Sequence, residues 1–324
     1  MKRAAELAIL AVLGIALGVL WLHYSGFNGP REGIEAMIAG MAERPFVYRQ
    51  LAALLVRSII AITGGGILAA SVELVLLSFV GWLWALRWLA ASVTPGSAMV
   101  ATVLAVGPVG LLFVSGGYLY DPLTLALFTF ALALLARRHW AAFCVLFPWL
   151  VLCRETSALL TLVYAVWAWP RVSRRRFAAD LAYQLIVFAA VKLWLAVRFA
   201  GNPGATVEFH PAEQVAFLLA YPLPNVLALS VYGAGLAAAL WRWNDQSAFL
   251  RAAAVILPAM FGAYWLLGFP GELRIFLEAY PVLFLLVWHT VWSRAALPTV
   301  ATLARWRERR RQVSPGTAML PGSQ

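Results

Sequence analysis

The sequence predicts an all-α protein, a polytopic bundle of transmembrane helices, and two observations carry this prediction. Hydrophobic residues make up 63% of the 324 residues and charged residues only 12%, a composition typical of membrane proteins and not of soluble domains. The apolar residues also occur in long runs bounded by glycine, proline and charged residues, which is the pattern of successive membrane crossings.

These runs predict about ten crossings in a single bundle of residues 1–298. Met1–His23 has a basic start but no clear small-x-small cleavage site, so it is interpreted as a retained first crossing. Residues 299–324 are expected to form a basic cytoplasmic tail that is partly disordered. The predicted crossings lie at residues 4–22, 67–90, 97–115, 121–136, 140–153, 156–169, 177–199, 224–241, 250–268 and 275–293.

Val47–Thr63 is predicted to form a helix that lies at the membrane interface. Arg49, Ala53 and Arg57 recur every four residues along one face, while the leucines lie mostly elsewhere. Such an amphipathic pattern suits a helix parallel to the membrane plane. The bundle is therefore expected to carry one or two interfacial helices in addition to its crossings.

The net charge of +11 is interpreted as an orientation signal and not as a nucleic-acid surface, because Lys and Arg gather in the short cytoplasmic loops of membrane proteins. On the predicted topology, 17 of the 25 Lys and Arg residues fall on one side, so this side and both termini are expected in the cytoplasm. These residues are Lys2, Arg3, Arg87, Arg137, Arg138, Arg171, Arg174, Arg175, Arg176, Arg242, Arg251, Arg294, Arg305, Arg307, Arg309, Arg310 and Arg311.

The first outer loop offers Glu32 and Glu35 as candidate catalytic carboxylates. One positioned carboxylate can act as a general base by taking the proton from an attacking hydroxyl. The alternative is a solvated loop with ordinary surface charges. Elsewhere the chain offers little for metal or redox chemistry: His210 has no companion His or Cys, and both cysteines lie in apolar helix.

A charged pair, Arg154-Glu155, interrupts the apolar stretch from Ala141 to Trp169. Because a charge at the bilayer centre is costly, two short helices with the pair at the turn are expected. Arg grips phosphate through two hydrogen bonds, so Arg154 indicates an anion site, whereas the alternative is an ion pair at the headgroups. Lys192, inside a predicted crossing, either extends to the membrane surface or points inward as a partner of a phosphate or a carboxylate.

Two further outer motifs stand at predicted helix starts. Tyr118, Tyr120 and Asp121 precede one crossing, and Glu272 and Arg274 precede the last one. Helix capping, the helix dipole and the preference of tyrosine for the interface can explain them structurally. The other explanation is a shared site, because both motifs face the same side of the membrane as Arg154.

Together these motifs resemble those of the GT-C glycosyltransferases, and the chain looks most like small bacterial members. The resemblance covers roughly residues 5–290. It implies a sugar donor linked to polyprenyl phosphate, a glycan, lipid or protein acceptor, and a place in the bacterial cytoplasmic (inner) membrane. One departure is that the first outer loop lacks the Asp that such enzymes usually carry. The matching motifs are Arg44–Leu51, Tyr118–Asp121, Arg154–Thr156, Glu272–Phe276 and Pro281.

On this resemblance, Glu35 or Glu32 would activate the acceptor hydroxyl, and Asp121 is a third catalytic candidate. A divalent cation, Mg²⁺ or Mn²⁺, stays open, with carboxylate oxygens as its ligands. Two other functions stay open as well: a lipid or polysaccharide transporter, and a non-catalytic membrane protein that binds a lipid carrier. The candidate substrate-binding residues are Arg49, Tyr118, Tyr120, Arg154, Glu155, Lys192, Glu272 and Arg274.

Overall fold

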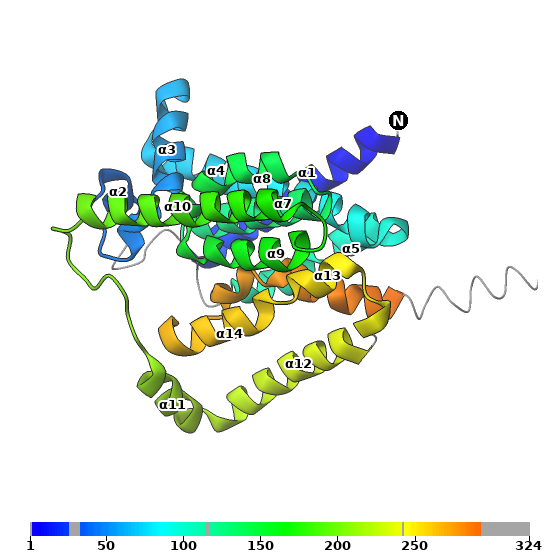
Figure 1. The fold of residues 1–324 in the computed structure, drawn as a ribbon. Coiled ribbons are helices and arrows are strands. Elements are labelled where there is room, and N and C mark those ends of the chain that lie inside the picture. Colours follow the sequence, from blue (N-terminus) through cyan, green and yellow to red (C-terminus); the bar gives the residue numbers. More distant parts are fainter. Residues whose placement is uncertain (1, 26–32, 114–116, 242, 293–324) are drawn as a thin grey trace, which may run out of the picture.

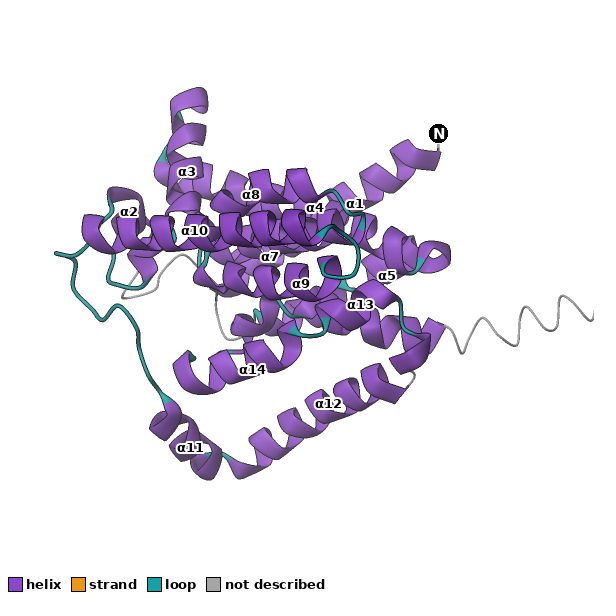
Figure 2. Ribbon diagram, in the orientation of Figure 1, coloured by secondary structure: helices purple, strands orange, loops and turns teal. Residues whose placement is uncertain are grey.

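A computed structural model of the chain describes residues 2–25, 33–113, 117–241 and 243–292. Within these ranges the protein is all-α, as the sequence predicts, and contains no strand beyond one isolated bridge between Arg44 and Gly204 (Figure 2). Glu32 and the predicted tail at residues 299–324 lie outside the described residues.

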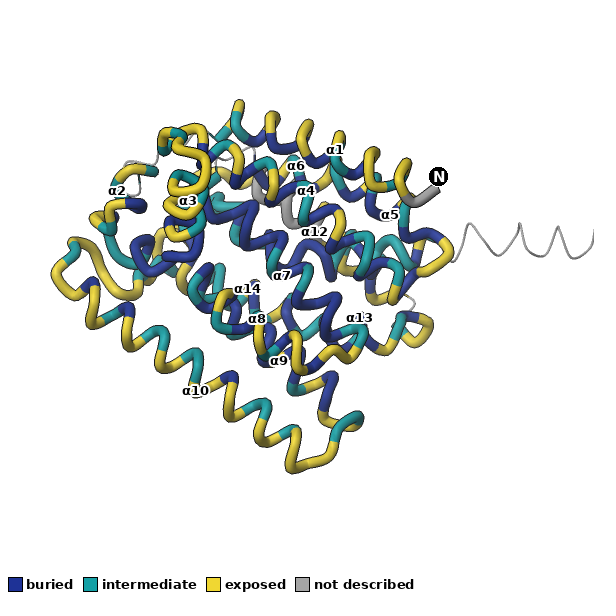
Figure 3. The backbone as a smooth tube through the Cα atoms, turned by 90° about the horizontal axis from the view of Figure 1, so that it is seen from above, coloured by how far each residue is buried: buried dark blue, intermediate teal, exposed yellow. Residues whose placement is uncertain are grey.

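Six helices make up the central part of the bundle, and one of them, α10, runs along its outer edge and is mostly exposed (Figure 3). The innermost is α7, which is buried along nearly its whole length (Figure 3). A helix that is apolar all round has no face to offer to water and is stable only inside a larger assembly. The six helices are α1 (Lys2–Ser25), α4 (Ile67–Val93), α7 (Tyr120–Ala136), α8 (Trp140–Cys153), α9 (Ala158–Ala168) and α10 (Arg174–Arg198).

Two glycines allow α1 to pack closely against α4. A Cβ atom on Gly14 would come within 2.7 Å of the Val80 Cα atom, and one on Gly18 within 2.7 Å of a Leu76 methyl carbon. Small residues at helix contacts let the two backbones approach, which increases van der Waals contact in an environment where lipid removes the hydrophobic driving force. The packing of the first helix therefore depends on these two positions.

The remaining helices surround this centre. The α3 helix runs across one end of the bundle and not along it (Figure 1), which is the direction expected of an interfacial helix. The surrounding elements are α2 (Ile34–Ala39), η1 (Phe46–Tyr48), α3 (Gln50–Thr63), η2 (Pro95–Ser97), α5 (Ala98–Leu104), α6 (Val106–Leu112), η3 (Glu155–Ser157), α11 (Pro211–Ala220), α12 (Pro222–Trp241), η4 (Trp243–Asp245), α13 (Ala248–Ala253), α14 (Ile256–Leu267), η5 (Leu273–Leu277) and a last helix, Tyr280–Trp292.

Among the residues that the structure describes, four helical segments are long and apolar enough to cross a membrane: Ala4–Ser25, Ile67–Val93, Arg174–Arg198 and Ala248–Leu267. The bent pair Pro95–Leu104 and Val106–Leu112, with an angle of 44°, would make a fifth. These helices mark a membrane protein. The predicted number of ten crossings is not confirmed, because five further apolar helices have only 10–17 residues, whereas about 20 residues are needed to cross the hydrocarbon core without tilt or thinning.

The arginine-rich turns predicted to be cytoplasmic and the predicted site motifs occupy opposite ends of the bundle. At one end, α7 leads into Arg137, whose Nη2 atom donates to the Trp88 carbonyl at 3.1 Å, and Arg87 pairs with Glu6 at 3.3 Å. At the other end, α7 begins beside Asp121 and α8 ends beside Arg154. The predicted site residues Asp121 and Arg154 therefore lie at the same end of the bundle.

Candidate functional site

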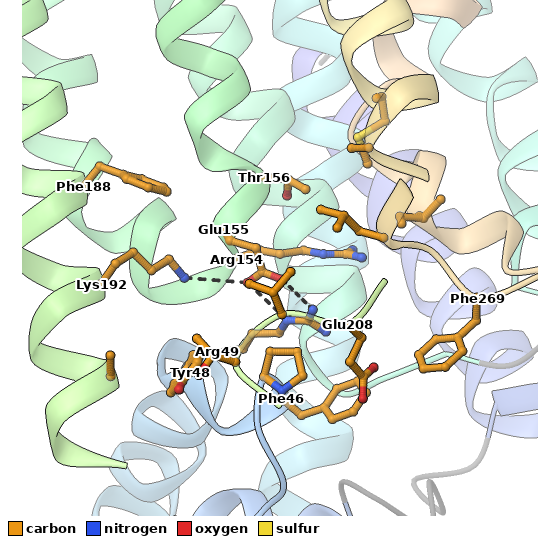
Figure 4. Close-up of a pocket in the computed structure, with 18 of the residues that line it drawn as sticks. Phe46, Tyr48, Arg49, Arg154, Glu155, Thr156, Phe188, Lys192, Glu208 and Phe269 are labelled. Atoms are coloured by element: carbon orange, nitrogen blue, oxygen red, sulfur yellow. Dashed lines mark hydrogen bonds and ion pairs between the residues drawn. The ribbon is translucent and has the colours of Figure 1, made fainter. Parts of the chain in front are cut away.

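A cavity of about 450 Å³ opens at the end of the bundle that carries Arg154. Its polar residues come from five separate segments, and its apolar wall comes mainly from α10 and α14 (Figure 4). A concave, mostly apolar site with a few convergent polar groups is the usual form of a ligand site. The charged residues of the lining are Arg49, Arg154, Glu155, Lys192, Glu208 and Glu272.

Arg49 and Lys192 meet on the carboxylate of Glu155. The Arg49 Nη2 and Nε atoms lie 2.6 and 3.5 Å from the two Glu155 oxygens, and Lys192 Nζ lies 3.7 Å from Oε2. Arg49 also donates to the Tyr120 hydroxyl and lies over the Tyr120 ring. Burial alone would raise the pKa of Glu155, but Arg49 and Lys192 hold this pKa well below its usual range. Glu155 is therefore a stable anion between two cations.

Arg49 reaches this position because the predicted helix Val47–Thr63 is broken at its start. A 3-10 turn ends at Tyr48, Arg49 adopts φ −90° and ψ 60°, and α3 begins only at Gln50. The side chain consequently points into the bundle and is buried. Arg57, two turns further along α3, instead donates to the Ile38 carbonyl. The two arginines that the amphipathic pattern placed on one face have different surroundings.

Arg154 is buried between two fully buried carboxylates. Its Nη1 atom lies 3.4 Å from Asp121 Oδ1 and 3.3 Å from Glu278 Oε1. Thr156 donates to the same Glu278 oxygen at 2.6 Å. Arg154 has extended backbone angles, φ −160° and ψ 147°, between the end of α8 and the turn η3, which confirms the predicted break between two short helices at this pair.

Asp121 connects this ion cluster to the last part of the chain. It accepts from the Tyr118 backbone at 2.8 Å and lies 4.0 Å from Arg274. Arg274 also bonds Glu272 at 2.8 Å, and its guanidinium carbon lies 3.2 Å from the centre of the Tyr118 ring. Both motifs that the sequence places at helix starts thus contact each other. Of their members only Glu272 lines the cavity, and the others lie behind it.

Several buried polar atoms near the cavity have no hydrogen-bond partner among the described residues. They include the Tyr48 hydroxyl, Arg154 Nε and Glu278 Oε2. Tyr48 and Arg154 line the cavity. Since buried polar atoms are nearly always hydrogen-bonded in native proteins, the two donors indicate a place for a ligand that carries acceptor oxygens.

The structure brings nine of the predicted site residues together and leaves one apart. Glu35 is exposed on α2 and does not line the cavity, so its role as a base stays a prediction without geometric support, and Glu32 is outside the described residues. Five of the nine line the cavity, and Tyr118, Tyr120, Asp121 and Arg274 lie behind it. The five are Arg49, Arg154, Glu155, Lys192 and Glu272.

Sequence reasoning missed Glu278, Thr156 and Glu208 as members of the site. Glu278 lies one turn beyond Arg274 at the start of an apolar helix, and an acid in that place is itself a signal. Glu208 had no signal beyond a neighbouring histidine. Across the parts of the chain that the structure describes, no group of three or more His, Cys, Asp or Glu residues could hold a metal ion, so the divalent cation stays a prediction.

No family model, curated protein or solved structure matches the chain.

Proposed function

We propose that the protein is a membrane glycosyltransferase that moves a sugar from a polyprenyl-phosphate carrier to an acceptor at the outer face of the cytoplasmic membrane. One observation carries the proposal: Arg49, Arg154 and Lys192 line a single cavity whose other walls are apolar. Cations that are buried beside apolar wall residues suit a ligand with an anionic head and a hydrocarbon chain. The motif resemblance to GT-C enzymes supports the same reading.

The phosphate would occupy the position now held by Glu155. The cations and carboxylates that line the cavity are equal in number, three of each, so an added phosphate must replace an existing carboxylate to be well bound. The Glu155 side chain is 38% exposed, whereas that of Arg49 is 9% exposed. Glu155 is therefore the partner that can swing away while Arg49 and Lys192 stay in place.

The lipid chain would lie against the wall formed by α10 and α14. Phe188, Leu193 and Ala196 come from α10, and Met260 and Leu267 come from α14. Burying apolar area contributes about 25 cal/mol per Å², which would help to offset the cost of bringing a phosphate out of water. The chain of a polyprenyl carrier provides such area, and a soluble sugar nucleotide does not.

Transfer would proceed by direct displacement at the anomeric carbon. The acceptor hydroxyl oxygen forms the new bond to this carbon and loses its proton to a carboxylate. The bond from carbon to the phosphate oxygen breaks, and its electron pair stays on that oxygen. Arg49, Arg154 and Lys192 stabilise the negative charge that develops there, as fixed cations do in phosphoryl and glycosyl transfer.

We further propose that the arginine-rich end of the bundle lies in the cytoplasm. The proposed bundle has about ten crossings, and the shorter apolar helices provide those beyond the long ones. In a Cys144→Ser, Cys153→Ser background, Arg174→Cys is expected to stay unlabelled and Ala205→Cys to be labelled when intact cells receive an impermeant thiol reagent. Ala205 is preferred over Gly204 because Gly204 has φ +87°. Labelling of the two positions in the reverse pattern would invert the orientation.

The function is tested with purified protein in liposomes. The donors are radiolabelled polyprenyl-phosphate glucose, mannose and galactose, and delipidated cell-envelope extract supplies the acceptors. Time-dependent movement of label from lipid to acceptor is expected with at least one donor. Tight binding of polyprenyl phosphate with no transfer from any donor would instead favour a non-catalytic lipid-carrier protein, the second candidate, which the exposed position of Glu35 favours.

Glu155→Gln is expected to strengthen binding of polyprenyl phosphate by about tenfold, because the phosphate then has no carboxylate to displace. The same change is expected to lower the melting temperature of the unliganded protein, since Arg49 and Lys192 become neighbouring cations without an anion. The melting temperature without ligand measures the loss of stability, and its rise on addition of polyprenyl phosphate measures the gain in binding. Asp180→Asn, which removes an acid at the opposite end of the bundle, serves as the control, and weaker binding by Glu155→Gln would contradict the displacement.

A further inference from the structure

The turn between α7 and α8 carries an arginine at a position that favours glycine. Arg138 has φ 61°, and among the described residues it is the only one besides glycines with a positive φ. The Arg138 and His139 backbones donate to the carbonyls of Leu135 and Leu134 at 3.0 and 2.9 Å, the Schellman arrangement that closes many helices. Glycine is the usual residue there, because a Cβ atom is strained in this backbone region. Arg138 therefore occupies the position at a cost to the backbone.

The Arg138 side chain meets a second arginine over one tryptophan ring. The guanidinium carbons of Arg171 and Arg138 lie 3.4 and 6.0 Å from the centre of the Trp167 ring. Arg171 also donates to the Trp167 carbonyl at 2.7 Å, and the buried Trp167 indole donates to the Leu135 carbonyl at 2.9 Å. The indole thus holds two cations that come from different turns of the bundle.

This arginine pair has no carboxylate partner in the part of the chain that the structure describes. Neither Arg138 nor Arg171 forms an ion pair there, and Asp180, an acid at this end of the bundle, pairs with Arg176 at 3.4 Å. Partial burial and the positive charge of Arg138 hold the pKa of Arg171 below its usual value, as expected of two neighbouring cations without an anion between them. A bound anion would supply the missing negative charge.

The orientation of the protein in the membrane does not account for the pair. The positive-inside rule concerns how many basic residues lie on one side, and exposed residues such as Arg174 and Arg175 at the start of α10 satisfy it. It requires neither an arginine at a glycine position nor two guanidinium groups on one ring. Such an arrangement suits an anion site, because arginine binds phosphate oxygens through parallel hydrogen bonds.

The surroundings of the pair fit a lipid headgroup. α7 and α9 end, and α10 begins, at the same end of the bundle (Figure 1). The exposed residues Leu162, Val166 and Trp169 are four and three residues apart, so they share one face of α9. This apolar face ends two residues before Arg171, and tryptophan at such a place is typical of the headgroup level of a membrane. A headgroup at the arginine pair would therefore have apolar surface beside it for an acyl chain.

We propose that Arg138 and Arg171 bind the phosphate group of an anionic phospholipid at the arginine-rich end of the bundle. The two guanidinium groups share the phosphate oxygens, Trp167 holds Arg171 in place, and an acyl chain packs on the exposed face of α9. The bound lipid connects the α7–α8 turn to the α9–α10 turn and so stabilises the packing of the helices. This site lies at the opposite end of the bundle from the cavity and does not depend on sugar transfer.

The test is binding of phosphatidylglycerol to the purified protein in dodecyl maltoside micelles. Dioleoyl phosphatidylglycerol is expected to raise the melting temperature of the wild type until the site is saturated, whereas dioleoyl phosphatidylcholine and glycerol phosphate should leave it unchanged. Arg138→Gly is expected to weaken phosphatidylglycerol binding about tenfold, the effect of losing one charge-assisted contact. Without lipid, this variant should melt at or above the wild-type temperature, because glycine suits the left-handed backbone.

The control is Arg87→Gln, which removes a cation from the same end of the bundle. Arg87 is already paired with Glu6 at 3.3 Å, so this variant should bind phosphatidylglycerol within about twofold of wild type. The proposal is overturned if the wild type shows no rise with phosphatidylglycerol, if Arg138→Gly binds it normally, or if Arg87→Gln weakens binding equally. Equal protection by glycerol phosphate would overturn the lipid assignment, and a clear fall in the melting temperature of unliganded Arg138→Gly would make Arg138 a structural residue instead.

Discussion

Arg154→Met is expected to lower the free energy of unfolding by about 3–5 kcal/mol, the usual cost of removing one partner from a buried ion cluster. Asp121 and Glu278 are both fully buried and lie 3.4 and 3.3 Å from the Arg154 guanidinium. Methionine fills most of the vacated volume, so lost charge and not lost packing should dominate. Denaturant unfolding of the purified protein in detergent micelles measures the effect.

A matched control comes from the opposite end of the bundle. The pair Arg176–Asp180 also has an N–O distance of 3.4 Å, but the Arg176 side chain is 51% exposed. Arg176→Met should therefore cost only about 0.2–1 kcal/mol, because solvent screens an exposed pair. If Arg154→Met and Arg176→Met lowered the free energy of unfolding equally, burial of the Arg154 cluster would contribute nothing to stability.

A double variant tests which carboxylate carries the cost. Glu278 has no cation within 4.0 Å other than Arg154 among the described residues, whereas Asp121 retains Arg274 at 4.0 Å. Adding Glu278→Gln to Arg154→Met is expected to recover a substantial part of the lost stability, since an uncompensated buried charge is removed. Further destabilisation by the second change would contradict this account of the cluster.

Arg49→Lys is expected to lower the rate of sugar transfer by about 10²–10³-fold, the effect of removing one positioned donor from a site of developing negative charge. The guanidinium of Arg49 contacts both oxygens of Glu155 and the Tyr120 hydroxyl at once. The single ammonium of lysine keeps the charge but cannot reproduce this planar grip on a carboxylate or phosphate. Initial rates with the radiolabelled donor, together with binding of polyprenyl phosphate, measure the loss.

The control for this variant is on the helix that follows Arg49. Arg57 belongs to α3, but it bonds the Ile38 carbonyl and does not line the cavity. Arg57→Lys should therefore leave transfer within about threefold of wild type. If the two substitutions lowered transfer equally, the effect of Arg49 would be a general disturbance of α3 and not loss of phosphate binding.

The positions of the helices followed from local properties of the sequence. The predicted range 140–153 coincides with α8, Trp140–Cys153, and the charged pair after it ends this helix as expected. Long apolar runs in a membrane protein must satisfy their backbone groups internally, and a helix does this with residues that are close in sequence. Polar residues and glycine between the runs then set the helix ends.

The placement of charges within apolar stretches also indicated candidate site residues, though not which of them would meet. Arg154, Glu155 and Lys192 were recognisable because ionisable residues within apolar stretches are costly and need partners. The partners of such residues come from far along the chain. Glu155 bonds Arg49, which is 106 residues away, and the neighbouring Thr156 bonds Glu278, which is 122 residues away. Such pairs depend on how whole helices pack, and the hydrophobic pattern of a single helix does not specify its neighbours.

The choice of carboxylate at the cavity was decided by tertiary structure alone. From the sequence, Glu35 and Glu208 are equally good candidates for a carboxylate at the cavity, since both lie in loops on the same predicted face of the membrane. The hydrogen bonds of Asn202 and of the His210 backbone bring Glu208 to the cavity, while Glu35 lies on the exposed face of α2. Alternating apolar and polar segments determine which end of a bundle a loop occupies, and only the contacts of its backbone determine where at that end each side chain lies.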